Sequence, residues 1–269
     1  CQWCHNPETH DPMPELLYKE EMCIGCGECL RQCPNGAIKV ENGKVFTDKE
    51  LCTLCGKCVD HCYAEAREMS GKYCSIDDIY KVVVRDKEFY DHTGGGVTLS
   101  GGEVMMHARF ASRLLKYLKE HGINTAIETC GYASWESVKS VVEYTDLLLY
   151  DVKHCDDEIH RKFTGMGNKL ILENLKRISE MGKEIIVRVP LIPGVNNTPD
   201  VICRIAEIAV DVRAKELHIL PFHQIGTSKW DAAGKDYKFR DVPEPTTEEV
   251  EELIKQAGEL HIPVVIGGN

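Results

Sequence analysis

The sequence predicts an α/β protein that carries a small cysteine-rich module near its N-terminus. Two observations predict this. Two cysteine runs with one shared spacing occupy residues 23–62, and from about Ser75 short apolar segments bounded by glycine or proline alternate with helical patterns. Such alternation is typical of parallel β/α units. Periodicity alone leaves open whether the sheet is doubly wound or forms a partial or full barrel.

The two cysteine runs share the spacing C-x2-C-x2-C-x3-C. In two-cluster ferredoxins with this spacing, three cysteines of one run bind one [4Fe–4S] cluster and the fourth binds the neighbouring cluster. The spacing therefore predicts two ligand sets, which are Cys23, Cys26, Cys29 and Cys62 for one cluster and Cys52, Cys55, Cys58 and Cys33 for the other. Structural zinc and disulfides are the alternatives, and the duplicated spacing argues against both.

The remaining elements follow in order along the chain. Residues 37–40 and 44–47 flank Asn42-Gly43, which predicts a β-hairpin. A helix over 75–88 has Ser75 as its N-cap and an apolar period near 3.6. Similar patterns predict helices over 105–121, 134–144, 169–181, 199–212 and 247–260. Short apolar segments predict strands over 96–100, 124–129, 146–152, 184–191, 216–221 and 263–266.

The composition is that of an ordinary globular protein, with 43% hydrophobic and 28% charged residues. Its 14 cysteines do not fit a secreted disulfide scaffold and favour a reducing, oxygen-poor cytoplasm. No segment approaches the ~20 apolar residues of a membrane span, and no signal-peptide pattern opens the chain. A net charge of -11 argues against nucleic acids and anionic membranes as partners.

Polar residues gather where the predicted strands end. They are Ser100-Gly101-Gly102-Glu103, Glu128-Thr129, Asp151-Val152-Lys153, Arg188 and His223. Ligands bind at this edge in both open sheets and barrels. Arg188 lies inside an apolar strand, where a buried guanidinium needs an anion. The alternatives are a core histidine at His223 and a simple ion pair between Asp151 and Lys153, which face the same side of a strand.

The chain opens on Cys1-Gln2-Trp3-Cys4-His5-Asn6-Pro7-Glu8. This segment resembles the end of the CxxxCxxC motif of radical S-adenosylmethionine enzymes, and is most similar to that of glycyl-radical-enzyme activating enzymes. Thr93–Glu103 (TGGGVTLSGGE) resembles the GGGVTxSGGE segment of that family, and residues 128–132, 151–153 and 220–223 resemble its later motifs in the same order. The cysteine-rich module between the first two motifs matches the larger members of the family.

The resemblance implies a fold and its domains. The fold is a partial (β/α)6-type parallel barrel with an inserted two-[4Fe–4S] ferredoxin domain, and the first barrel strand is missing from this chain. The implied domains are an N-terminally truncated radical-cluster loop at 1–17, the ferredoxin-like insert at 18–74 and the partial barrel at 75–269.

The resemblance also implies the ligands of a third cluster, the one that binds S-adenosylmethionine. Cys1 and Cys4 would be two of its three catalytic ligands, and the third cysteine would lie four residues before Cys1, outside this sequence. Three thiolates leave one iron of such a cluster open for the substrate. Trp3 and His5 would pack near the adenine.

The strand-end residues would hold the rest of the S-adenosylmethionine. Those for the methionine amino group are Gly101, Gly102 and Glu103. Those for a monovalent-cation and carboxylate site are Glu128, Thr129 and Asp151. Those for the carboxylate or ribose of S-adenosylmethionine are Lys153, Arg188 and His223.

The implied reaction is reductive cleavage of S-adenosylmethionine, followed by removal of a hydrogen atom from a glycine of a partner glycyl radical enzyme. Flavodoxin or ferredoxin would donate electrons, the two ferredoxin-type clusters would relay them, and the protein would act as a monomer. The alternatives are a ferredoxin-type electron-transfer protein and a radical S-adenosylmethionine enzyme that acts on a small molecule.

Three positions depart from the family's pattern. Glu128 stands where aspartate is common, so one more methylene would displace a cation ligand. Val104 stands where proline often follows the Gly-Gly-Glu motif, and no cost is expected from that change. Tyr63 replaces proline after the second cysteine run, which would loosen that turn.

Overall fold

The computed structural model describes residues 1–41 and 43–267, which form two compact units. The barrel unit contains residues 1–2, 74–223 and those from 241 onward, and the cysteine unit contains residues 3–73 and 224–240. The predicted domain boundaries at 17/18 and 74/75 stay a prediction, as does a further strand before Cys1.

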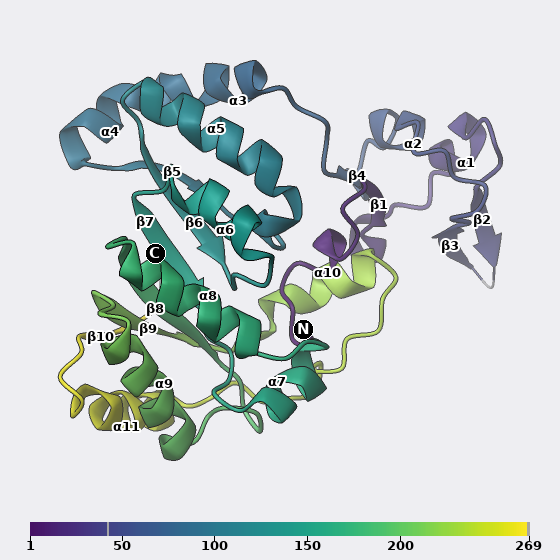
Figure 1. Ribbon diagram of the computed structural model, residues 1–269. Coiled ribbons are helices and arrows are strands. Elements are labelled where there is room, and N and C mark those ends of the chain that lie inside the picture. The colour runs from purple at the N-terminus through teal and green to yellow at the C-terminus, as the bar shows by residue number, and fades with distance from the viewer. Residues whose placement is uncertain (42, 268–269) are drawn as a thin grey trace. The chain divides into compact units, whose positions relative to one another are not determined.

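The barrel unit is built on one parallel sheet of six strands. They are β5 (Gly96–Leu99), β6 (Asn124–Thr129), β7 (Leu147–Asp151), β8 (Glu184–Leu191), β9 (Glu216–Pro221) and β10 (Val264–Ile266). Their order in the sheet is β10-β9-β8-β7-β6-β5, so every strand lies beside its neighbour in sequence (Figure 1). A doubly wound sheet would reverse direction at a switch point. The order therefore confirms the partial-barrel progression.

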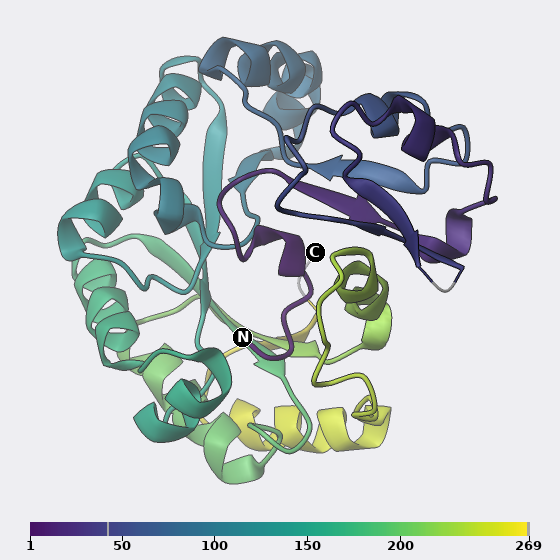
Figure 2. The same ribbon diagram turned by 90° about the vertical axis from the view of Figure 1, so that its right-hand side faces the viewer.

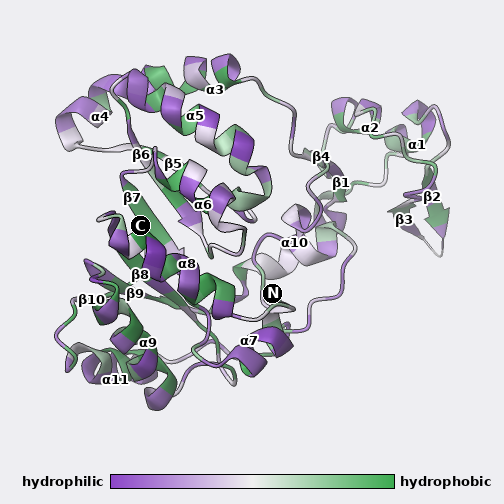
Figure 3. Ribbon diagram, in the orientation of Figure 1, coloured by the Kyte–Doolittle hydropathy of each residue, from purple (hydrophilic) through white to green (hydrophobic). Residues whose placement is uncertain are grey.

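Helices cover the outer face of this curved sheet (Figure 2). The covering helices are α5 (Ala108–Glu120), α6 (Trp135–Val142), α8 (Lys169–Glu180), α9 (Pro199–Asp211) and α11 (Thr247–Gly258). Hydrophobic and hydrophilic residues alternate along α5 and α8 (Figure 3). The apolar side of each covering helix joins one buried core with the strands, for example Leu115, Val138, Leu175, Ile205 and Leu253.

The predicted helix over 75–88 differs from the structure. Ser75 is the expected N-cap and also forms a capping box with Asp78. However, α3 (Ile76–Val83) ends early, a 3-10 turn follows at Val84–Asp86, and α4 (Lys87–Thr93) continues the chain. The predicted helix over 105–121 also begins differently, with a 3-10 turn η4 (Val104–His107) before α5. A helix that was not predicted is α7 (Asp157–Thr164), which starts at the N-cap Asp156.

The cysteine unit contains two antiparallel strand pairs. One pair is β1 (Glu15–Tyr18) with β4 (Arg67–Ser70), and the other is the predicted hairpin of β2 (Ile38–Glu41) with β3 (Lys44–Thr47). Asn42 of the hairpin turn lies outside the described residues. The helices are α1 (Glu28–Gln32), α2 (Lys57–Asp60) and α10 (Thr227–Ala232), with 3-10 turns at Pro7–Thr9, Glu20–Met22 and Gln224–Gly226.

Within the described residues, no helix combines the length and the apolar character that crossing a membrane requires.

Candidate functional site

Glu103 is the most constrained carboxylate at the strand ends of the barrel unit. The chain leaves β5 through Gly101, whose φ of 127° lies in a region that favours glycine, and reaches Glu103 at the start of η4. One carboxylate oxygen, Oε1, accepts from the backbone N–H of Met105 at 3.0 Å and from the hydroxyl of Thr129 at 2.6 Å. The other, Oε2, accepts from the backbone N–H and the thiol of Cys130, at 2.9 and 3.0 Å.

Cys130 therefore belongs to this group of residues, although it was not among the site residues predicted from the sequence. Burial, together with the nearby Glu103 carboxylate, raises the pKa of Cys130 to about 12. The thiol thus keeps its proton at neutral pH and remains a hydrogen-bond donor to Glu103. The only sequence signal for this role is its position directly after Glu128-Thr129 at a strand end.

Four further charged residues form one ion-paired network across β6, β7 and β8. Arg188 donates from Nη1 to Oε1 of Glu128 at 2.6 Å and from Nε to Oδ1 of Asp151 at 3.0 Å. Lys153 donates to the other oxygen of Asp151 at 3.1 Å. Parallel pairing sets Asp151 directly beside Arg188, which explains the contact. The ion pair of Asp151 with Lys153, which the sequence offered as an alternative to ligand binding, is present in the structure. The carboxylates beside Arg188 agree with the anion expected for a guanidinium in an apolar strand.

The network favours the charged forms of Asp151, Lys153 and Arg188. Burial alone would raise the pKa of Asp151, but the charges of Lys153 and Arg188 outweigh it and lower that pKa. The Asp151 carboxylate in turn overcomes the burial of Lys153 and raises the pKa of its ammonium group. Only 11% of the Arg188 side chain is exposed, so its guanidinium is stabilised largely by the carboxylates of Glu128 and Asp151. Ser100 donates a hydrogen bond to the second oxygen of Glu128.

Close packing fixes the turn after β6. Gly131 has a φ of 68°, and a Cβ at this position would lie 1.9 Å from the hydroxyl oxygen of Tyr150. The buried amide of Asn174 donates to the carbonyl oxygens of Gly131 and Ala133, at 2.8 and 2.9 Å. This turn carries the backbone N–H and thiol of Cys130, so the packing also positions the donors to Glu103.

The structure brings together most of the predicted residues of the barrel unit. Hydrogen bonds join Glu103 with Thr129 in one group. They join Arg188 with Glu128, Asp151 and Lys153 in a second group, which lies beside the first because Glu128 and Thr129 are consecutive in β6. Gly101 and Gly102 directly precede Glu103. His223 lies two residues after β9, at the same edge of the sheet. Cys1 is exposed in this unit, and the next residue, Gln2, bonds through its backbone N–H to the carbonyl oxygen of Phe163 at 3.0 Å.

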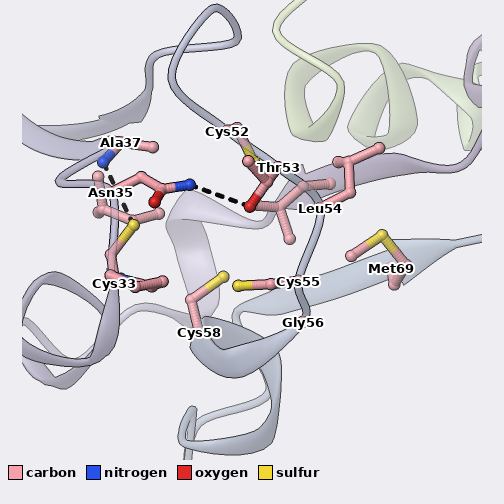
Figure 4. A pocket seen from close by; sticks show the side chains of 13 residues that line it. Cys33, Asn35, Ala37, Cys52, Thr53, Leu54, Cys55, Gly56, Cys58 and Met69 are labelled. Atoms are coloured by element: carbon pink, nitrogen blue, oxygen red, sulfur yellow. Dashed lines mark hydrogen bonds between the residues drawn. The ribbon is translucent and has the colours of Figure 1, made fainter.

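In the cysteine unit, one cavity collects four thiols from both cysteine runs. Cys33 from the first run lines it together with Cys52, Cys55 and Cys58 from the second, among apolar residues such as Ile38 and Met69 (Figure 4). This grouping is the one that the spacing predicts for one cluster. Among the residues that the structure describes, no three His, Cys, Asp or Glu side chains are grouped to hold a single metal ion.

Backbone N–H groups support Cys33 as a cluster ligand. Its sulfur accepts from the backbone N–H of Ala37 at 3.2 Å (Figure 4). Burial alone would raise the pKa of this thiol, but backbone N–H groups of residues 35–38 outweigh it and lower the pKa. Hydrogen bonds to sulfur of this kind tune the properties of iron–sulfur clusters.

The segment with Trp3, Cys4 and His5 is held by residues 224–240 of the same unit. Trp230 on α10 donates to the carbonyl oxygen of Cys4 at 2.7 Å, and a Cβ at Gly226 would lie 2.9 Å from the His5 ring. Trp3 is only 5% exposed and packs edge-to-face on Phe239, with ring centroids 5.9 Å apart. No prediction was made for residues 224–240, and their contacts to residue 4 are too distant in sequence to leave a local pattern.

Comparisons with known proteins agree with both units. Residues 56–203 match the sequence pattern of the Radical SAM superfamily, and residues 15–69 match that of the 4Fe-4S dicluster domain. Radical SAM denotes radical S-adenosylmethionine. The two matches together span the cysteine runs and the strand-end residues of β5 to β8.

Individual relatives are similar over most of the chain. The trans-4-hydroxy-L-proline dehydratase activating enzyme of Clostridioides difficile is 41% identical over 271 residues, which cover 100% of this chain and 90% of that protein. The choline trimethylamine-lyase activating enzyme of Oleidesulfovibrio alaskensis is 40% identical over 250 residues, which cover 90% of this chain and 81% of that protein. A crystallised domain of a pyruvate-formate lyase-activating enzyme from Bacteroides vulgatus is 30% identical with a TM-score of 0.55, covering 65% of this chain and 99% of that domain.

Proposed function

The chain belongs to the glycyl-radical-enzyme activating enzymes of the radical S-adenosylmethionine superfamily, and we propose that the strand-end network of its barrel unit is the S-adenosylmethionine site. Iron–sulfur clusters and S-adenosylmethionine are the cofactors of this chemistry. When bound, they supply the radical reaction that removes a hydrogen atom from a glycine of the partner enzyme.

The arrangement of Glu103 and the ion-paired network carries this proposal. Three carboxylates (Glu103, Glu128 and Asp151) and two cations (Lys153 and Arg188) have a net formal charge of −1. S-adenosylmethionine has a sulfonium, an ammonium and a carboxylate, and therefore a net charge of +1. The site is thus complementary in charge, and it offers an anion for the ammonium group and cations for the carboxylate.

The residues around this site orient the ligand rather than react with it. Glu103 would accept from the ammonium group while Thr129 and Cys130 hold its carboxylate in place. Lys153 and Arg188 would bind the methionine carboxylate, with His223 near the ribose. A site whose charged groups are fixed in advance needs little rearrangement when the ligand binds.

We propose three clusters for the protein with its upstream cysteine. Cys1 and Cys4 would share one with that cysteine, near Trp3 and His5 at the adenine. The cavity in Figure 4 supports the set of Cys33 with Cys52, Cys55 and Cys58. The remaining set would be Cys23, Cys26, Cys29 and Cys62. These two clusters would relay electrons from flavodoxin or ferredoxin, and the protein would act as a cytoplasmic monomer.

The direct test is formation of a glycyl radical. The reduced, cluster-loaded protein would be incubated anaerobically with S-adenosylmethionine and a panel of glycyl radical enzymes, followed by electron paramagnetic resonance. The panel would include a trans-4-hydroxy-L-proline dehydratase and a choline trimethylamine-lyase, because two relatives are named for activating them. A glycyl radical in one member, with matching formation of 5′-deoxyadenosine, is expected. Cleavage of S-adenosylmethionine that depends on a small molecule instead would contradict the proposal.

A monovalent cation in this site would share its ligands with Arg188. Glu128 and Asp151 already accept from this guanidinium, so we expect the wild-type protein to bind S-adenosylmethionine almost independently of Na⁺ or K⁺. Glu128→Asp shortens the side chain by one methylene and withdraws it from Arg188. In this variant, replacing tetramethylammonium by K⁺ at constant ionic strength should strengthen the binding of S-adenosylmethionine about tenfold, which is the effect of one charged contact. Equal cation dependence in both proteins would contradict this expectation.

Cys130 is expected to act through Glu103. Cys130→Ala removes one donor from the Glu103 carboxylate and leaves it less firmly oriented, so binding of S-adenosylmethionine should weaken by about 3- to 10-fold. Cys130→Ser keeps a donor and should retain most of the affinity. Isothermal titration calorimetry under anaerobic conditions measures the affinity of both variants for S-adenosylmethionine. If the serine variant bound as weakly as the alanine variant, a hydrogen-bond donor at position 130 would have no role in binding.

A further inference from the structure

Arg67 is a buried cation without a matching anion in the described part of the cysteine unit. It is 2% exposed, and its Nη1 donates to the hydroxyl oxygen of Thr47 at 2.8 Å. Its Nε and Nη2 have no hydrogen-bond partner within residues 1–41 and 43–267, and no carboxylate there forms a salt bridge with it. A charge in such a position is costly unless an anion lies nearby.

The thiols of the cysteine unit, as ligands of an iron–sulfur cluster, would supply that anion. The guanidinium of Arg67 stacks on the ring of Tyr18, 4.8 Å from its centroid, and the hydroxyl of Tyr18 bonds to the sulfur of Cys23. Arg67 is therefore linked through Tyr18 to Cys23, one ligand of the proposed set of Cys23, Cys26, Cys29 and Cys62.

The internal repeat shows which cluster Arg67 would face. Arg67 follows Cys62, the last cysteine of its run, by the same interval that separates Ile38 from Cys33, and a buried alanine precedes both. Ile38 lines the cavity of Cys33, Cys52, Cys55 and Cys58. By the symmetry of the repeat, Arg67 takes the equivalent place beside the set that contains Cys62. One repeat thus presents an apolar residue to its cluster, and the other presents a charge.

We propose that Arg67 raises the reduction potential of the ferredoxin-type cluster on Cys23, Cys26, Cys29 and Cys62 above that of its neighbour. The inference rests on the ligand sets of the proposed function. One electron adds one negative charge to a cluster, and a fixed positive charge in a poorly solvated place favours the reduced form. Because Ile38 supplies no such charge on the other side, the two clusters would differ in potential and would accept electrons in a set order.

The test is a redox titration of neutral and charged variants. Arg67→Gln removes the charge and keeps a polar group that can reach Thr47, whereas Arg67→Lys keeps the charge. Arg31→Gln is the matched control, because Arg31 lies near the first cysteine run, pairs with Glu28 and has a side chain that is 63% exposed. Iron is counted first, and each cluster is then titrated against a mediator series by electron paramagnetic resonance.

Arg67→Gln should lower the ratio of reduced to oxidised form of one cluster at least tenfold at a fixed potential, which is about 59 mV for one electron. Arg67→Lys and Arg31→Gln should stay within about threefold of wild type. Unchanged potentials in Arg67→Gln, or an equal loss in Arg67→Lys, would overturn the proposal.

Two further outcomes are decided by the iron count. If Arg67→Gln binds less iron than wild type, Arg67→Met replaces it in the titration, because methionine is neutral and apolar like Ile38 in the other repeat. If both neutral variants lost iron while Arg67→Lys kept all of it, the positive charge at position 67 would be needed only for cluster assembly. That result would overturn the proposal. A wild-type protein without ferredoxin-type clusters would refute the proposed function itself rather than the role of Arg67.

Discussion

Glu103→Gln is expected to weaken the binding of S-adenosylmethionine about 10- to 100-fold without loss of iron. Among the described residues at the end of β5, only this carboxylate can take the charge of the ligand's ammonium group, and a hydrogen bond to a charged group contributes about 1.5–3 kcal/mol. Glutamine keeps one oxygen to accept from Met105 or Thr129, so the turn should keep its shape. Anaerobic calorimetry on the fully loaded protein measures the change.

Glu136→Gln is the matched control for this experiment. Glu136 is an exposed glutamate in the first turn of α6, and its replacement changes the net charge by the same amount. Wild-type affinity is expected for this variant. If Glu103→Gln also bound with wild-type affinity while holding all its iron, Glu103 would serve only as the cap of η4, and the electron-transfer alternative would regain support.

The strand-end site was predictable because parallel strands impose it. Strands β6, β8 and β9 have the bounds expected from their short apolar segments. Glu128, Asp151 and Arg188 lie in the C-terminal halves of β6, β7 and β8, toward one edge of the sheet. The sequence therefore identified Glu128, Asp151 and Arg188 as members of one site. It could not show which carboxylate pairs with Arg188, because that depends on strand register and on the length of each side chain.

The features that were not predicted from the sequence depend on elements too short to show a pattern or on contacts between residues far apart in the chain. Helix α10 has six residues, too few for an apolar period to emerge, and it matters because Trp230 and Lys229 bond to residues 4, 6 and 8. Strands β1 and β4 have four residues each and pair across the whole cysteine module. The burial of Arg67 could not be predicted from the neighbouring residues either, because an arginine in a polar segment is usually exposed.

Cys33→Ala is expected to remove the same cluster as Cys55→Ala, although the two cysteines belong to different runs. Both line one cavity with Cys52 and Cys58, so each variant should lose about four irons and the same paramagnetic signal. The double variant Cys33→Ala/Cys55→Ala should lose no more than either single variant, because effects within one shared unit are not additive. Cys33→Ala/Cys26→Ala should lose about eight irons, since Cys26 belongs to the other proposed set.

Cys155→Ala is the control for the general effect of removing a thiol. Cys155 lies in the barrel unit and packs against its apolar core, so this variant should retain all its iron. The iron count and the spectra together distinguish the crossed arrangement from one in which each run holds its own cluster. In the uncrossed arrangement, Cys33→Ala/Cys26→Ala would lose only about four irons, and Cys33→Ala/Cys55→Ala would lose about eight. That result would contradict the ligand sets, and with them the place assigned to Arg67.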